Sequence, residues 1–292
     1  MSRRRLRPEE CWPAGERDVR VRRLPLASRL AVRVVESGND GARPVLLVHG
    51  WGGTSYTWRK QLPALAAAGF RPIAVDLKGH GLSDKPHDPM EYRLGALVTH
   101  LREVMDALGI TQVPIVGQSL GGRISLELAF TEPERVERLA LVSSVGFGRV
   151  SFAGLLPRLV PASVVPHLPR FAPRPVVAAV MRRAYGSLAQ RDERDVDEYW
   201  SQGADPGFVK ALHSLLVGVD MSPLGADRLQ ALPMAWMAIE GTRDRIVRKA
   251  RLDPAVDALL ESRLEIVQGA GHLVNEECPE PVNDALLRFL TA

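Results

Sequence analysis

The sequence predicts an α/β protein with a mostly parallel central sheet, helices on both faces of the sheet, and an inserted helical segment. Short β-rich runs alternate with helical runs in two separated regions of the chain. The central runs VLLVHG, PIAVDL, VPIVGQ and LALVSS are apolar nearly throughout, which is typical of parallel strands covered on both faces. Between about residues 145 and 232 the alternation stops, which indicates an insertion.

The strands are expected, in chain order, at residues 21–26, 30–36, 45–49, 72–76, 113–116, 139–143, 234–240 and 263–267. A helix is expected at 94–108, where Leu94, Leu97 and Val98 begin an apolar series with helical spacing and Gly109 is a stop signal. The last helix is expected near 281–290. This regular order of strand and helix predicts βαβ crossovers.

The predicted domains are an α/β core, residues 1–144 and 233–292, and a helical cap, residues 145–232. Six prolines open the insertion and limit its helices to short pieces: Pro157, Pro161, Pro166, Pro169, Pro173 and Pro175. Longer helices are expected around 190–202 and from Asp205-Pro206, a good N-cap and first-turn pair. We expect the cap to cover the carboxyl edge of the sheet, where its apolar residues line a pocket or form a core of their own.

Composition is that of a soluble globular protein, with 292 residues, 46% hydrophobic and 25% charged. No apolar run is long enough to predict a membrane span. The arginine-rich N-terminus lacks the apolar core of a secretory signal, and its acidic residues argue against a transit peptide, so a cytoplasmic protein is expected. Cys11 and Cys278 have no metal-ligand or redox spacing and are expected to be reduced.

The formal net charge of +4 has two interpretations. A basic surface attracts nucleic acid or anionic lipid, whereas a compositional preference for arginine has no functional meaning. No nucleic-acid recognition motif accompanies the charge, so the second interpretation is favoured and no nucleic-acid partner is expected.

Ser119 lies in the sequence GQSLGG, after the strand VPIV and before a helical run. This strand, G-x-S-x-G, helix arrangement resembles the nucleophile elbow of α/β-hydrolases. A sharp turn lifts the serine away from the backbone, and Gly117 and Gly121 allow the strand and helix to approach closely. The helix N-terminus also favours negative charge beside the serine. Ser119 is therefore the predicted nucleophile.

The resemblance implies that the acid and the histidine follow the serine in that order. Three histidines come after Ser119; His167 and His213 fall in the predicted cap, whereas His272 follows the last strand in GAGH. A histidine in a loop at that edge can reach the serine and act as its base. His272 is the predicted base.

Asp244 is the predicted acid, because it follows the strand MAWMAIE and the turn Gly241-Thr242. Glu240 is the nearest rival, although as a strand residue it must point correctly across the sheet. Asp253 and Asp257 fall in what the sequence indicates is the next helix. The acid would hold the histidine in the correct tautomer and stabilise the imidazolium.

The oxyanion hole is predicted from two backbone N–H groups. One belongs to Leu120, the residue after the nucleophile. The other is expected in HGWGG, after an earlier strand, with Trp51 as the donor. Neither G-x-x-x-x-G-K-[ST] nor G-x-G-x-x-G is present, so this glycine-rich loop is not expected to bind a nucleotide, and no cofactor or metal is required.

The motifs HGWGG, DLKGHGLSD, GQSLGG, GTRDRIV and GAGH, in this order, resemble the α/β-hydrolase family and its capped serine-hydrolase branch. The resemblance implies that His80 and Asp84 in DLKGHGLSD stabilise a turn. A serine nucleophile at 119 argues against the haloalkane dehalogenases and epoxide hydrolases of this fold, which use aspartate. Leu120 replaces the tryptophan of proline iminopeptidases.

The predicted function is hydrolysis of a carboxylic ester with an apolar moiety, through an acyl-enzyme on Ser119. The alternatives are carbon–carbon bond hydrolysis or acyl transfer in the same fold, and a binding protein without turnover. The partner is expected to be a small hydrophobic ester. Its binding residues are expected to be Trp51 and the following cap residues: Phe152, Leu156, Phe171, Val177, Met181 and Trp200.

Overall fold

All eight expected strands occur and form one sheet in the computed structural model, which describes residues 4–151, 164, 173–186, 192–248, 256, 258–259 and 263–292. Their order across the sheet is β1-β2-β4-β3-β5-β6-β8-β10. β1 and β2 pair antiparallel, β2 and β4 pair antiparallel, and the remaining pairs are parallel. The strands are β1 (Val19–Pro25), β2 (Ala31–Ser37), β3 (Arg43–Val48), β4 (Phe70–Val75), β5 (Val113–Gln118), β6 (Val136–Val142), β8 (Ala235–Gly241) and β10 (Leu264–Val267).

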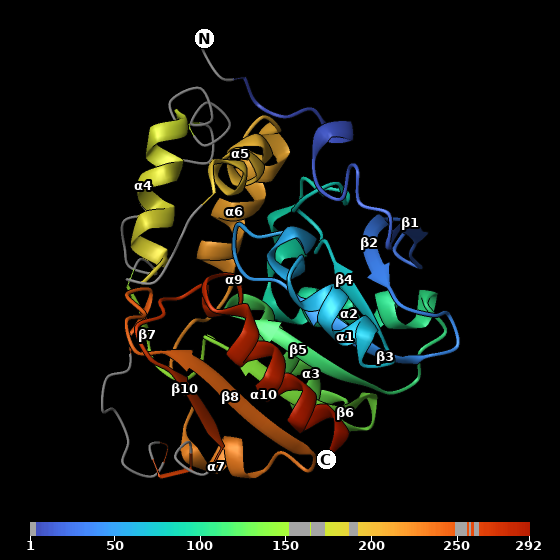
Figure 1. The fold of residues 1–292 in the computed structure, drawn as a ribbon, viewed down its shortest axis with the longest axis vertical. Coiled ribbons are helices and arrows are strands. Elements are labelled where there is room, and N and C mark those ends of the chain that lie inside the picture. Colours follow the sequence, from blue (N-terminus) through green and yellow to red (C-terminus); the bar gives the residue numbers. More distant parts are fainter. Residues whose placement is uncertain are drawn as a thin grey trace.

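Alternate residues of the central strands enter two separate hydrophobic cores. In β3, Val45 and Leu47 join the core on one face of the sheet, and Leu46 and Val48 join the core on the other. Helices α1 (Gln61–Ala67) and α10 (Pro279–Thr291) cover the first face, while α2 (Leu94–Ala107) and α3 (Leu120–Thr131) cover the second (Figure 1). This burial of both faces explains why the central strands are apolar throughout.

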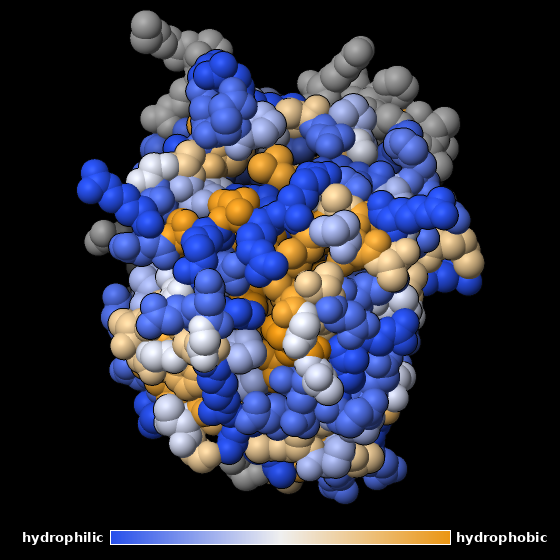
Figure 2. Space-filling view, turned by 90° about the vertical axis from the view of Figure 1, so that its right-hand side faces the viewer, coloured by the Kyte–Doolittle hydropathy of each residue, from blue (hydrophilic) through white to orange (hydrophobic). Residues whose placement is uncertain are grey.

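The edge of the sheet at β1 carries charged side chains. Arg20, Arg22 and Arg23 are exposed on this strand, and charged residues on an edge strand discourage pairing with another chain. The side of the molecule that bears β1 and β2 is mostly hydrophilic, with hydrophobic residues gathered in a hollow across its middle (Figure 2). Part of the arginine excess therefore protects the edge of the sheet.

The insertion contains helices α4 (Arg174–Ala184), α5 (Glu193–Gln202), α6 (Pro206–Gly218) and α7 (Ala226–Gln230) among the described residues. Helices α4, α5 and α6 gather at one end of the molecule (Figure 1). The two helices expected from the sequence are α5 and α6, and Asp205 caps α6 by accepting the N–H of Gly207. The domain boundary at 145–232 stays a prediction.

Helix α4 was not expected from the sequence, because prolines crowd the first part of the insertion. Its 11 residues form a helix because Pro173 is the N-cap residue and Pro175 lies in the first turn. Backbone N–H groups have no intrahelical acceptor there, so proline removes no hydrogen bond. The chain also forms a two-stranded sheet, β7 (Arg149–Val150) with β9 (Val247–Arg248), which joins the insertion to the segment after β8.

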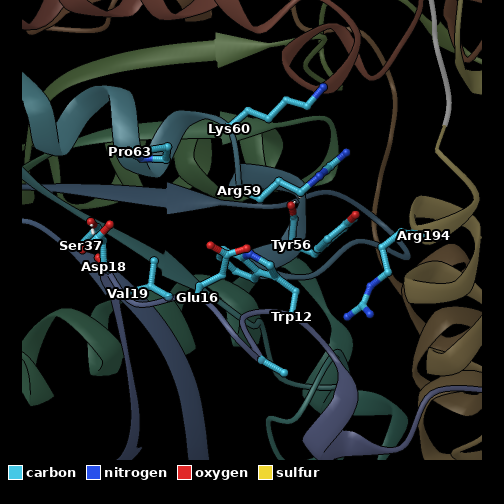
Figure 3. A pocket seen from close by; sticks show the side chains of 11 residues that line it. Trp12, Glu16, Asp18, Val19, Ser37, Tyr56, Arg59, Lys60, Pro63 and Arg194 are labelled. Atoms are coloured by element: carbon cyan, nitrogen blue, oxygen red, sulfur yellow. Dashed lines mark hydrogen bonds between the residues drawn. The ribbon is translucent and has the colours of Figure 1, made fainter.

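The N-terminal segment before β1 connects the insertion to the core. The N–H of Leu6 donates to the Ser201 hydroxyl (2.7 Å) and the N–H of Trp12 donates to the Glu198 carboxylate (2.8 Å), both on α5. The Arg33 guanidinium on β2 donates to the carbonyl of Trp12 (2.7 Å). A surface pocket of about 490 Å³ lies between this segment, α1 and α5 and is bordered by Trp12, Tyr56 and Arg194 (Figure 3).

The helices of the described residues are all too short or too polar to cross a membrane.

Candidate active site

Ser119 occupies the turn between β5 and α3 in a conformation that few residues other than glycine adopt. Its φ is 52° and its ψ is −115°. A Cβ at Gly117 would lie 2.6 Å from the Cα of Gly122, and a Cβ at Gly121 would lie 2.3 Å from the Val48 carbonyl oxygen. The glycines therefore have the steric role expected of them, since no side chain fits where strand and helix approach. Backbone strain of this kind is often retained at functional sites.

Asp244, His272 and Ser119 form a continuous chain of hydrogen bonds. His272 Nδ1 lies 2.8 Å from Asp244 Oδ2, and His272 Nε2 lies 3.0 Å from Ser119 Oγ. An ionised carboxylate only accepts hydrogen bonds, so Nδ1 carries the proton and the neutral imidazole presents Nε2 as an acceptor for the serine hydroxyl. This arrangement can take a proton from Ser119.

The loop after β8 holds the carboxylate of Asp244 in place. Its Oδ1 accepts the backbone N–H groups of Ile246 (2.7 Å) and Val247 (3.0 Å), which leaves Oδ2 for His272. Ser119 is 7% exposed and His272 is 6% exposed. Because little water reaches this chain of hydrogen bonds, its electrostatic interactions are stronger than at the surface.

The loop after β3 lies directly beside the serine. A Cβ at Gly50 would lie 2.8 Å from Ser119 Cβ, so the residue before Trp51 adjoins the nucleophile turn. The Trp51 indole N–H donates to the carbonyl of Leu212 on α6 (2.9 Å), which ties this loop to the insertion. Leu120 begins α3, where backbone N–H groups have no intrahelical acceptor. Gly50 and Leu120 thus adjoin Ser119 from the loop after β3 and from the start of α3, and the oxyanion-hole roles of Trp51 and Leu120 stay predictions.

Two buried histidines form hydrogen bonds with the backbone of this loop. His49 Nε2 accepts the N–H of Leu77 (3.0 Å), so its Nδ1 carries the proton and donates to the carbonyl of Gly50 (2.8 Å). His80 Nε2 accepts the N–H of Gly52 (3.3 Å). Burial lowers the pKa of His49 and lowers that of His80 well below its usual value, so both stay neutral. His80 thus contacts the loop beside Ser119 and not the serine itself.

Asp84 also has structural contacts. Its carboxylate accepts the N–H of Ala31 (2.7 Å) at the start of β2, and its carbonyl accepts the N–H of Gly79 (2.9 Å). These bonds close the turn in DLKGHGLSD against the sheet.

The rivals for the acid and the base lie elsewhere or outside the described residues. Glu240 is within β8, and the His272 imidazole forms its hydrogen bond with Asp244. His213 lies on α6. The candidates His167, Asp253 and Asp257 lie outside the described residues.

Of the predicted substrate-binding residues, Phe152, Leu156 and Phe171 lie outside the described residues. Met181 is buried in an apolar cluster with Ala178, Tyr185 and Val196, against which Val177 packs. The Trp200 ring lies 5.2 Å from the Arg5 guanidinium carbon. Substrate binding by Met181, Val177 and Trp200 stays a prediction.

The residues that hold the histidine loop in place were not identified from the sequence. Glu276 and Glu277, in the short helix α9 (Val274–Glu277), both contact α4 or the segment that follows it. Two glutamates before a proline are typical of an exposed helix start, so only their position soon after GAGH could have marked them.

A cavity of about 490 Å³ borders the acid, and its lining includes Asp244, Arg245, Arg248 and Ile266. The pocket in Figure 3 has none of the three hydrogen-bonded residues in its lining. Within the described part of the chain, no group of three or more His, Cys, Asp or Glu side chains could hold a metal ion.

Comparison with known proteins places the chain in a family. Residues 43–279 match the family model described as "alpha/beta hydrolase fold". An uncharacterized protein of Mycobacterium tuberculosis is 31% identical over 275 residues, which cover 90% of this chain and 78% of that protein. The 2-hydroxymuconate semialdehyde hydrolase of a Pseudomonas species is 29% identical over 271 residues, covering 89% and 90%.

Solved structures share the fold. The 2-hydroxy-6-oxo-6-phenylhexa-2,4-dienoate hydrolase of a Rhodococcus strain superposes with a TM-score of 0.75 at 23% identity, covering 94% of this chain and 99% of that one. The chain belongs to the α/β-hydrolase family, as its motifs led us to expect, and the family includes serine hydrolases and esterases.

Proposed function

We propose that this protein is a serine hydrolase that cleaves a carboxylic ester with an apolar moiety. The observation that carries the proposal is the hydrogen-bonded chain from Asp244 through His272 to Ser119. A serine hydroxyl is a weak nucleophile until a base accepts its proton, and His272 Nε2 is within reach to do so. Asp244 would keep the imidazole in the required tautomer and stabilise it once it is protonated.

The reaction begins when Ser119 Oγ attacks the ester carbonyl and its proton passes to His272 Nε2. The tetrahedral oxyanion accepts hydrogen bonds from the N–H groups of Leu120 and Trp51; loss of one such donor costs about 2.7–4 kcal/mol of activation free energy. The tetrahedral intermediate collapses to an acyl-enzyme while the imidazolium gives its proton to the leaving alcohol. Water activated by His272 then releases the acid and restores the serine.

The serine at position 119 narrows the class of reaction. Relatives of this chain include an epoxide hydrolase of Mycobacterium tuberculosis that is 26% identical. The resemblance set out from the motifs assigns an aspartate nucleophile to epoxide hydrolases, whereas this chain has Ser119. A serine nucleophile attacks a carbonyl carbon and forms an acyl ester with the substrate as its covalent intermediate.

Carbon–carbon bond hydrolysis is the second candidate. It is favoured by the relative named 2-hydroxymuconate semialdehyde hydrolase, which matches this chain over nearly its whole length. The same three residues can serve both reactions, so the residues around the substrate decide between them. Acyl transfer to an alcohol differs only in the group that accepts the acyl chain.

Labelling with a fluorophosphonate probe tests the nucleophile. We expect the wild-type protein to gain one probe mass on Ser119 and the Ser119→Ala variant to gain none. Ser28→Ala, which removes an exposed hydroxyl from the β1–β2 turn, is the matched control and should label like the wild type. A folded wild-type protein that stays unlabelled would contradict the proposal. Negligible turnover together with tight ligand binding that survives Ser119→Ala would favour a binding protein.

Turnover separates the two reactions. We expect hydrolysis of p-nitrophenyl esters with medium acyl chains to exceed hydrolysis of 2-hydroxy-6-oxo-6-phenylhexa-2,4-dienoate. The opposite order, measured by kcat/KM, would make carbon–carbon hydrolysis the function.

A further inference from the structure

The loop that carries His272 is hydrogen-bonded to the C-terminal end of α4. The backbone N–H of His272 itself donates to the carbonyl of Ala184 (2.7 Å), the last residue of α4. One carboxylate makes the second connection: Glu277 Oε1 accepts the N–H of Gly271 (2.9 Å) and Oε2 accepts the N–H of Gly186 (2.7 Å). The Glu277 carboxylate thus accepts hydrogen bonds both from Gly271, the residue before His272, and from Gly186, the residue after Tyr185.

The two backbones touch where these bonds form. A Cβ at Gly186 would lie 2.3 Å from the carbonyl oxygen of Gly269, and a Cβ at Gly271 would lie 2.4 Å from that of Ala184. On the other side of the loop, a Cβ at Gly241, the last residue of β8, would lie 2.3 Å from the carbonyl oxygen of Ala270. The histidine loop is therefore enclosed between the end of β8 and the end of α4.

A buried cluster of charged and tyrosine side chains holds the same end of α4. The Tyr185 hydroxyl donates to Glu276 Oε2 (3.2 Å), and the Tyr199 hydroxyl on α5 donates to Glu276 Oε1. The Arg59 guanidinium pairs with Glu276 (2.6 Å) and with Asp195 on α5 (2.7 Å). Arg59 also lies over the Tyr56 ring, 4.0 Å from its centroid, and the two are side by side in Figure 3.

The core holds the residues just before His272, because the Arg243 N–H donates to the Ala270 carbonyl (2.8 Å) and the Gly269 N–H donates to the Thr242 hydroxyl (2.9 Å). It holds the backbone of His272 itself only weakly. The Gln118 side-chain amide lies 3.5 Å from the His272 carbonyl, which is at the limit of a hydrogen bond. The imidazole must nevertheless reach both Asp244 and Ser119, and a shift of about 1 Å in a catalytic group can lower a rate about 100-fold. The short bonds made by the backbone N–H groups of His272 and Gly271 go to Ala184 and Glu277.

We propose that Glu277 is a positioning residue for His272, and that with the 184–186 segment it forms a clamp that aligns the histidine with Asp244 and Ser119. The catalytic consequence rests on the proposed serine-hydrolase function. If α4 moves away from this edge, the N–H of His272 loses the carbonyl of Ala184 and the Glu277 carboxylate loses the N–H of Gly186, so the histidine loses its alignment. The insertion is then needed for catalysis as well as for binding the substrate.

The test uses the full-length protein and two readouts. The first is the second-order rate constant of fluorophosphonate labelling at a temperature where circular dichroism shows each variant folded. The second is the NMR signal of the His272 Nδ1–H, assigned with His272→Ala, which reports the hydrogen bond to Asp244 without any turnover. We expect Glu277→Ala to slow labelling about 100-fold and to shift or broaden the Nδ1–H signal.

Conservative and matched variants separate positioning from folding. Glu277→Gln keeps one oxygen that accepts an N–H, so we expect it to restore labelling to within about tenfold of the wild type. Gly186→Ala displaces the same contact from the α4 side without a change of charge, and we expect it to act in the same direction. Glu280→Gln, an exposed carboxylate three positions after Glu277, and Gly225→Ala, whose Cβ meets nothing within 4 Å, should change neither readout.

A Glu277→Ala protein that labels at the wild-type rate would overturn the clamp, as would slowed labelling with an unchanged Nδ1–H signal. If Glu277→Ala does not fold, Glu277→Gln and Gly186→Ala decide by the same criteria. A wild-type protein without labelling would remove the proposed function only, because the Nδ1–H comparison would still support or overturn the clamp.

Discussion

The two sides of the candidate site are held in different ways. On the serine side, the turn is built into the sheet, since Gly117 allows β5 and α3 to meet and Gly121 allows α3 to approach the Val48 carbonyl at the end of β3. On the histidine side, His272 is held by Ala184, which is 88 positions earlier in the chain, and by Glu277, which reaches Gly186. Contacts within the central sheet and its helices position the nucleophile, and contacts from the insertion help to position the base.

This difference has a physical consequence. The serine turn is part of the large sheet and its two cores, so its stability is close to that of the whole fold. The histidine loop is bonded to the segment after β8 by the Arg243 N–H, but it also depends on how α4 and α5 dock, through a few hydrogen bonds and one buried charge cluster. Changes in the insertion should therefore disturb the histidine side first.

The largest expected effect is on the histidine side, from Asp244→Asn. The amide can present its NH2 to His272 Nδ1, which places the imidazole proton on Nε2, where it cannot accept the serine proton. We expect kcat on a p-nitrophenyl ester to fall about 10⁴-fold with little change in thermal stability. Glu240→Gln, the rival acid, should leave kcat within a small factor of the wild type, and the reverse result would assign the acid to Glu240.

A smaller effect is expected from Arg59→Met, which leaves Asp195 and Glu276 without their cation. Removal of one partner from a buried ion pair destabilises a protein by about 3–5 kcal/mol, because a buried charge loses its compensation. Urea denaturation should show this loss, and the protein that remains folded should label more slowly. The control, Arg288→Gln, breaks an exposed pair with Glu265 and should change stability by less than about 1 kcal/mol.

The smallest expected effect is on the pH dependence of stability, through His100 near the serine side of the site. Burial lowers the pKa of His100 to about 3, and its Nε2 accepts the N–H of Lys78 in the turn that also carries His80. The unfolded chain binds the proton near the ordinary histidine pKa of about 6.5. His100 therefore contributes stability that is complete above that pH and decreases as the pH falls toward the folded-state pKa.

Denaturation measured between about pH 6 and pH 4 checks this sign. We expect His100→Gln to reduce the pH dependence of the unfolding free energy by about 1.4 kcal/mol per pH unit. His87→Gln removes an exposed histidine and should leave the slope unchanged. A steeper slope for His100→Gln would mean that His100 is charged in the folded protein.

Much of the core could be predicted because its signals are local. Each of the eight strands lies within a few residues of its predicted range, since apolar runs bounded by Gly, Pro and Asp mark a strand without reference to distant residues. Helix α4 escaped prediction because proline density alone does not reveal whether prolines fall in a first turn.

The sequence by itself determined the fold and the candidates for the site. Chain order and strand ends selected Ser119, Asp244 and His272, because parallel strands bring the loops at their carboxyl ends to one edge of the sheet. Only the tertiary structure decided what holds the histidine in place. The distant partners of Glu276 and Glu277 lie on α5 or directly after α4 and η2 (Ser55–Trp58), and no local pattern encodes contacts between segments so far apart in the chain.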